Sequence, residues 1–113
     1  MDRIIEYFGK SLIKNVRDRS ISQMEMKIKG EMIDEDSKKL YSRLEKLDIQ
    51  EMELIKDIIP QIIDLTFHNM LFMIENDDEI KLMIKNKDLK EESDGLAGEL
   101  YSEDGWIKKF SKK

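Results

Sequence analysis

The chain has 113 residues, of which 40% are apolar and another 40% are charged. It contains no cysteine, which excludes disulfides, thiolate metal sites and a cysteine nucleophile. Its net charge of −5 argues against nucleic-acid binding, because nucleic-acid binders present a basic face to the phosphates.

This length is typical of one domain, and the apolar content is high enough for one core, so we expect a single helical domain over residues 1–113. The N-terminus is amphipathic from its first residues and does not resemble a signal peptide. The longest apolar-rich region, 58–74, is interrupted by a proline and by polar residues, so it is unsuited to crossing a membrane. We therefore expect a cytoplasmic protein without a membrane partner.

The first predicted helix begins after Asp2, a suitable N-cap, and extends to Arg19 or beyond. Its apolar residues recur every three or four positions, which places them on one buried face: Ile5, Phe8, Leu12 and Val16. Lys10, Lys14 and Arg17 fall on the opposite side, which we interpret as the solvated face of this helix.

The pattern over 21–32 fits a helix or a strand, because its apolar residues satisfy both periods. Helix-forming Gln, Glu, Lys and Met dominate it, which favours a helix with a break between Gly30 and Asp36. A third helical stretch begins at Asp36 or Ser37 and carries apolar residues as far as Leu47.

The central predicted helix covers 49–75 and is introduced by a capping box formed by Asp48 and Glu51. Its polar residues occupy a narrow arc and the rest of its circumference is apolar, so we expect other elements to surround it as the core. Pro60 either kinks this helix or divides it in two, and the unbroken periodicity favours a kink.

A further helix is predicted over 79–90, followed by a turn-rich connector and a short final segment. In that segment Trp106, Ile107 and Phe110 are expected to dock the chain end on the other helices. The predicted fold is therefore all-α: a compact antiparallel bundle of four to five helices, with 93–113 packed onto it.

The candidate partner-binding residues are mostly acidic or aromatic. Four carboxylates of the central helix lie on one strip beside the only histidine, and such a strip suits a basic partner. Two aromatic residues near the C-terminus are typical interface anchors, although their segment is equally suited to be a docked tail. These candidates are Glu53, Asp57, Asp64, His68, Glu75, Tyr101 and Trp106.

Asp64 and His68, four residues apart, could begin a metal site, but a hydrogen bond at the rim of the core is the simpler interpretation. The chain has no phosphate-binding loop and no nucleophile paired with a base, so no catalytic residue, metal or cofactor is predicted.

Three functions follow, in order of preference. The first is a small acidic protein-binding module without catalytic activity, which holds a basic or catalytic partner as an immunity or antitoxin protein does. The second is a structural homodimer that shares the excess apolar surface of the central helix. The third is a metal-dependent enzyme built on carboxylates and His68.

Overall fold

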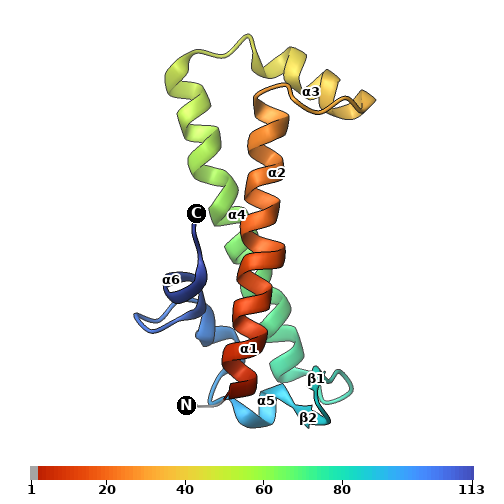
Figure 1. The fold of residues 1–113 in the computed structure, drawn as a ribbon, viewed down its shortest axis with the longest axis vertical. Helices are drawn as coiled ribbons and strands as arrows, with labels where there is room; N and C mark the ends of the chain where they lie inside the picture. Colours follow the sequence, from red (N-terminus) through yellow and green to blue (C-terminus); the bar gives the residue numbers. More distant parts are fainter. Residues whose placement is uncertain (1–2) are drawn as a thin grey trace.

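The computed structural model describes residues 3–113, which form a long helical hairpin whose lower end is covered by the C-terminal segment (Figure 1). The first arm is one continuous rod made of α1 (Arg3–Leu12), the π-helical turn η1 (Ile13–Arg17) and α2 (Asp18–Ile28). Helix α3 (Glu35–Leu44) projects from the upper end, and α4 (Ile49–Asn76) returns as the second arm. The predicted all-α class is confirmed at this level.

The chain after α4 wraps the lower end of the hairpin. It forms a two-stranded antiparallel hairpin, β1 (Met83–Ile84) and β2 (Lys87–Asp88), and then three short helices. These are α5 (Leu89–Glu92), the 3-10 helix η2 (Leu96–Leu100) and α6 (Trp106–Phe110). Helix η2 lies along α4, whereas α5 and α6 pack against α1, so the C-terminal segment joins both arms.

Local signals in the sequence account for several helix ends. Of the two interpretations of 21–32, the helix is confirmed as far as Ile28, where α2 ends; Gly30, two residues later, adopts a φ of 77°. Gly30 N–H donates to the carbonyl of Lys27, and Glu31 N–H donates to that of Met26, which together form a Schellman cap. The capping box of Asp48 and Glu51 is also present. The predicted N-cap, Asp2, lies outside the described residues.

The predicted helix over 79–90 is wrong. Lys85 and Asn86 both have positive φ angles, 51° and 68°, and they form the two-residue turn between β1 and β2. Lys90 then folds back, and its Nζ donates to the carbonyls of Ile74, Asp77 and Ile80. The contact to Ile74 satisfies a carbonyl in the last turn of α4, and the three contacts together hold Lys90 against the end of this helix and the residues that follow it.

The π-helical turn moves the buried face of the first arm by one residue. Leu12 is buried as predicted, but the inward positions after it are Ile13 and Arg17. A π turn contains one residue more than an α turn, so every later side chain is rotated around the axis. Val16, predicted to be buried, is therefore exposed, and Arg17, predicted to be solvated, is buried.

The main hydrophobic core lies in the lower part of the molecule. It joins α1, η1, the second half of α4 and the C-terminal segment, and its most enclosed residues include Ile13, Leu71, Leu96 and Trp106. The upper part, formed by α2, α3 and the first half of α4, contributes no residue of α2 or α3 to this core. With extents of 49 × 29 × 20 Å, the molecule is elongated and does not have the compact bundle arrangement that we predicted.

Helix α4 is continuous through Pro60, so the proline does not divide it. The prediction that α4 is enclosed around most of its girth is wrong, since only Phe67, Leu71 and Ile74 among its residues are buried. Within residues 3–113, no helix has the combination of length and apolar character that crossing a bilayer requires.

Gly9 allows the single tryptophan to reach the core. A Cβ added at Gly9 would lie 2.3–2.4 Å from atoms of the Trp106 indole, whose ring also packs edge-on against Phe8 with centroids 5.7 Å apart. We expect Gly9→Ala to displace the indole and to lower the free energy of unfolding by about 1–3 kcal/mol.

Urea unfolding followed by tryptophan fluorescence measures this effect. Gly98→Ala is the matched control, because nothing lies within 4 Å of a Cβ added there. Equal stability of the two variants would contradict the packing role assigned to Gly9.

Candidate functional site

The predicted site residue Asp64 belongs to a buried ion pair with Arg17, which is 4% exposed. Arg17 Nε donates to Asp64 Oδ1 at 2.6 Å, and Nη2 donates to Oδ2 at 3.2 Å. This two-point contact joins the first arm to α4. It also turns the Asp64 carboxylate toward Arg17, so the expected Asp64–His68 hydrogen bond at the rim is replaced by this pair.

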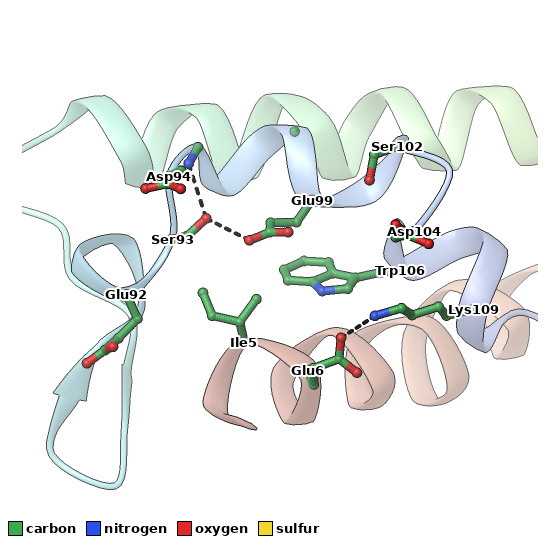
Figure 2. Close-up of a pocket in the computed structure, with 12 residues that line it drawn as sticks. Ile5, Glu6, Glu92, Ser93, Asp94, Glu99, Ser102, Asp104, Trp106 and Lys109 are labelled. Atoms are coloured by element: carbon green, nitrogen blue, oxygen red, sulfur yellow. Dashed lines mark hydrogen bonds and ion pairs between the residues drawn. The ribbon is translucent and has the colours of Figure 1, made fainter. Parts of the chain in front are cut away.

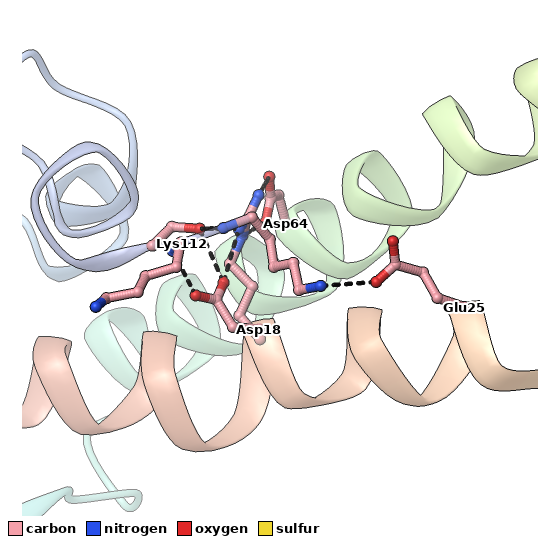
Figure 3. A network of polar contacts seen from close by, with 7 residues as sticks. Asp18, Glu25, Asp64 and Lys112 are labelled. Atoms are coloured by element: carbon pink, nitrogen blue, oxygen red, sulfur yellow. Dashed lines mark hydrogen bonds and ion pairs between the residues drawn. The ribbon is translucent and has the colours of Figure 1, made fainter.

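The same guanidinium holds the chain end (Figure 3). Its Nη1 donates to Asp18 Oδ1 at 3.1 Å and to Ser111 Oγ at 2.8 Å. Asp18 also accepts hydrogen bonds from Ser111 Oγ and from the backbone N–H of Lys112. Beyond these, Lys113 Nζ donates to Glu25 at 2.8 Å. The network therefore ties α2, α4 and the C-terminal residues together at one point.

Electrostatics favour a charged Arg17 despite its burial. Loss of water acts to lower the pKa of Arg17, but the hydrogen bonds and negative charges of Asp64 and Asp18 outweigh it, and the pKa is raised above its ordinary value. A buried guanidinium with these partners has little freedom to act on a ligand. We interpret the network as structural.

Two other predicted residues, His68 and Tyr101, lie beside this network. The His68 ring is positioned between Phe72 and Tyr101, with centroids 6.3 and 5.7 Å away, and its buried Nδ1 has no hydrogen-bond partner. Tyr101 is half-exposed, and its hydroxyl donates to the backbone carbonyl of Asp64 at 2.9 Å. Partial burial, and then the charge of Asp64, raise the pKa of Tyr101.

The remaining predicted residues do not form one surface. Glu75 accepts a hydrogen bond from the backbone N–H of Ala97 at 3.0 Å, and so anchors η2 on α4. Trp106 is 2% exposed and belongs to the core, so it is not available as a surface anchor. Only Glu53 and Asp57 are exposed carboxylates on α4 without such a structural task among the contacts described. Two of the four carboxylates of the predicted strip, Asp64 and Glu75, are thus used to hold the fold together.

A groove between α1 and the C-terminal segment gathers other carboxylates (Figure 2). Its volume is about 540 Å³. Two of its acids are engaged, because Glu6 pairs with Lys109 and Glu99 accepts a hydrogen bond from Ser93 Oγ. Glu92, Asp94 and Asp104 also line the groove. Sequence analysis did not single out this groove, because its walls come from segments about ninety residues apart.

Neither the network nor the groove has the form of a metal centre. Over residues 3–113, no three His, Asp or Glu side chains are grouped closely enough to hold a metal ion. Near His68, the Asp64 carboxylate is already occupied by Arg17.

The most extensive feature left open is an apolar face on α4. At 100° per residue, six large side chains fall within an arc of about 100°, and each is between 41% and 61% exposed. These residues, called the α4 face below, are Leu54, Ile58, Ile62, Leu65, Phe72 and Met73. Tyr101, the residue that follows η2, lies at the edge of this face, because it lines one hollow with Ile58, Ile62 and Leu65.

A comparison with known protein families, curated proteins and solved structures finds no match to this chain. The chemistry available for a function is therefore that of the described residues: an apolar helix face, an acidic groove and a buried ion-pair network.

Removing the Asp64 charge tests the structural role of the network. Asp64→Asn leaves a buried guanidinium without its main counter-charge, and we expect a loss of about 3 kcal/mol in the free energy of unfolding. The measurement is urea unfolding followed by circular dichroism. Glu53→Gln, at an exposed acid of the same helix, is the control and should have no measurable effect. The double variant Arg17→Met with Asp64→Leu should lose less free energy of unfolding than the sum of the losses in the single variants Arg17→Met and Asp64→Leu. Strictly additive losses would contradict an energetic coupling between the two side chains.

Tyr101 offers a prediction in alkaline solution. Because its pKa is raised in the folded state, its contribution to stability is present below the ordinary tyrosine pKa of about 10 and is lost as the pH rises through the folded value. The difference in absorbance at 295 nm between wild type and Tyr101→Phe isolates this residue from the other two tyrosines. We expect its midpoint above 10, and a midpoint at or below 10 would contradict the geometry.

Proposed function

We propose that this chain is a protein-binding module without catalytic activity, and that its docking surface is the α4 face. The single observation that carries the proposal is the exposure of six large apolar side chains on one arc of one helix. Single exposed apolar residues are normal in soluble proteins, but a continuous group of them is typical of an interaction site.

The size of the face supports this function. A free large side chain exposes about 200 Å², so six half-exposed ones leave roughly 600 Å² of apolar surface. At about 25 cal/mol per Å², covering it provides up to about 15 kcal/mol of gross driving force, part of which is spent on ordering the two partners. A helix with its own apolar stripe is the shape that fits such a face.

The polar residues also favour binding over chemistry. Arg17, Asp64 and Glu75 hold elements of the fold together through their side chains. His68 packs between two rings on the flank of the α4 face. In this arrangement Tyr101 and His68 form part of the rim of the docking surface, where an aromatic residue with a polar tip is well suited.

A second candidate function is binding of a basic partner in the acidic groove, in the manner of an immunity protein. Its motivation is the set of carboxylates that lines the groove together with the net charge of −5. Such a surface attracts and orients a basic protein through long-range electrostatics.

Capture from a lysate of the source cells distinguishes the two surfaces. Tagged wild-type protein is compared with Leu65→Glu, which places a charge on the α4 face, and with the double variant Asp94→Lys and Asp104→Lys, which reverses charge in the groove. We expect Leu65→Glu to lose the stoichiometric protein bound by wild type, whether that protein is a second copy or another chain, and the groove variant to retain it.

Circular dichroism provides the folding control, since all three positions are exposed. If only the groove variant loses the bound protein, the docking surface is the groove and not the α4 face. Retention in both variants would rule out both surfaces.

A further inference from the structure

We infer that the occupant of the α4 face is a second copy of this chain, which packs its own α4 parallel to the first as a two-stranded coiled coil. This inference rests on the proposed function and names its partner. The coiled coil would form the dimer through the same helix that the buried network fixes in place.

The sequence of α4 contains a heptad seam within the exposed arc. Six residues follow one another at alternating spacings of three and four, which is the coiled-coil repeat. They define the seam: Ile55, Ile58, Ile62, Leu65, Asn69 and Phe72. All of them except the half-buried Ile55 are exposed. At 1.5 Å per residue, the seam runs for about 27 Å along the helix.

The residue types in the seam favour two parallel strands. The a positions are Ile55, Ile62 and Asn69, and the d positions are Ile58, Leu65 and Phe72. Isoleucine at a with leucine at d, as at Ile62 and Leu65, favours parallel dimers, and a single asparagine at a specifies the oligomeric state. Pro60 falls at position f, on the far side of the helix, so its ring does not enter the seam.

Asn69 points to an identical partner. It is exposed and is the one polar residue of the seam. In a parallel two-fold pair it lies opposite Asn69 of the second copy, where each amide supplies the donor and acceptor that the other needs. A foreign apolar helix would bury this amide unpaired, at a cost comparable to a lost hydrogen bond.

Charge does not oppose this pairing, although each copy has a net charge of −5. The positions that flank the seam between 54 and 73 carry no formal charge: Leu54, Ile59, Gln61, Thr66, His68 and Met73. The acids Glu53, Asp57 and Asp64 lie at outer positions of the heptad. Two copies therefore meet without placing like charges across the interface.

The area also fits a dimer. A standard protein interface buries about 800 Å² per partner, and the roughly 600 Å² of the α4 face is the apolar part of such an interface. Its polar rim would be supplied by residues such as Tyr101, which is half-exposed beside Asp64.

The test uses opposite charges at one seam position. In the parallel pair Ile62 faces Ile62 of the second copy, so Ile62→Lys and Ile62→Glu should each be monomeric, with a dissociation constant raised at least about 100-fold by the unpaired charges. Mixing the two variants should restore a dimer. Light scattering coupled to size-exclusion chromatography, over micromolar to millimolar protein, measures each mass.

Ile33→Lys and Ile33→Glu are matched controls, because Ile33 is 86% exposed but lies outside α4, and they should remain dimeric like wild type. A monomeric wild type at every concentration would overturn the inference, as would a dimer that tolerates both Ile62 variants. Restoration by Ile62→Lys mixed with Leu65→Glu, but not by the two Ile62 variants, would overturn the parallel arrangement.

The inference of a second copy can fail while the proposed function still holds. A strictly monomeric protein that captures a different chain, and loses it in Leu65→Glu, would retain the docking surface and replace only its occupant.

Discussion

The structure depends on one buried ion pair. Arg17 and Asp64 come from different arms of the hairpin, and the same guanidinium reaches Asp18 and Ser111. Removing two charges from water is costly, and the cost is offset here by a two-point contact and by further hydrogen bonds to the same cation. Because the contact has a narrow geometry, it fixes the rotation of α4 relative to the first arm and determines where the end of the chain lies.

That rotation decides which side of α4 is left open. One side of the helix meets α2, and another carries η2, held by Glu75 and Tyr101. The apolar residues on the remaining side of the helix, the α4 face, stay between 41% and 61% exposed. The main core lies in the lower part because the C-terminal segment packs there and supplies Leu89, Leu96, Leu100 and Trp106 to it.

The same acidic side chains can either form a charged binding surface or make contacts that hold the fold together. Asp64 and Glu75, which by spacing belong to a binding strip, are used to attach the first arm and η2. Glu53 and Asp57 of the same strip stay exposed on α4, and a second group of carboxylates lines the groove beside α1. A net charge predicts that acidic surface exists, but it contains no information on which carboxylates are free.

Features that depend on near neighbours along the chain could be predicted from the residues alone. The capping box at Asp48, the cap at Gly30 and the helical class follow from residues a few positions apart, because these contacts form within one turn. Features that depend on residues distant in the sequence became apparent only in the tertiary structure. The π turn that buries Arg17, the hairpin at Lys85 and the exposure of the α4 face are such cases. Helical periodicity shows that a face is apolar, but whether this face is covered depends on elements whose positions are set by contacts such as that between Arg17 and Asp64, which are remote in sequence.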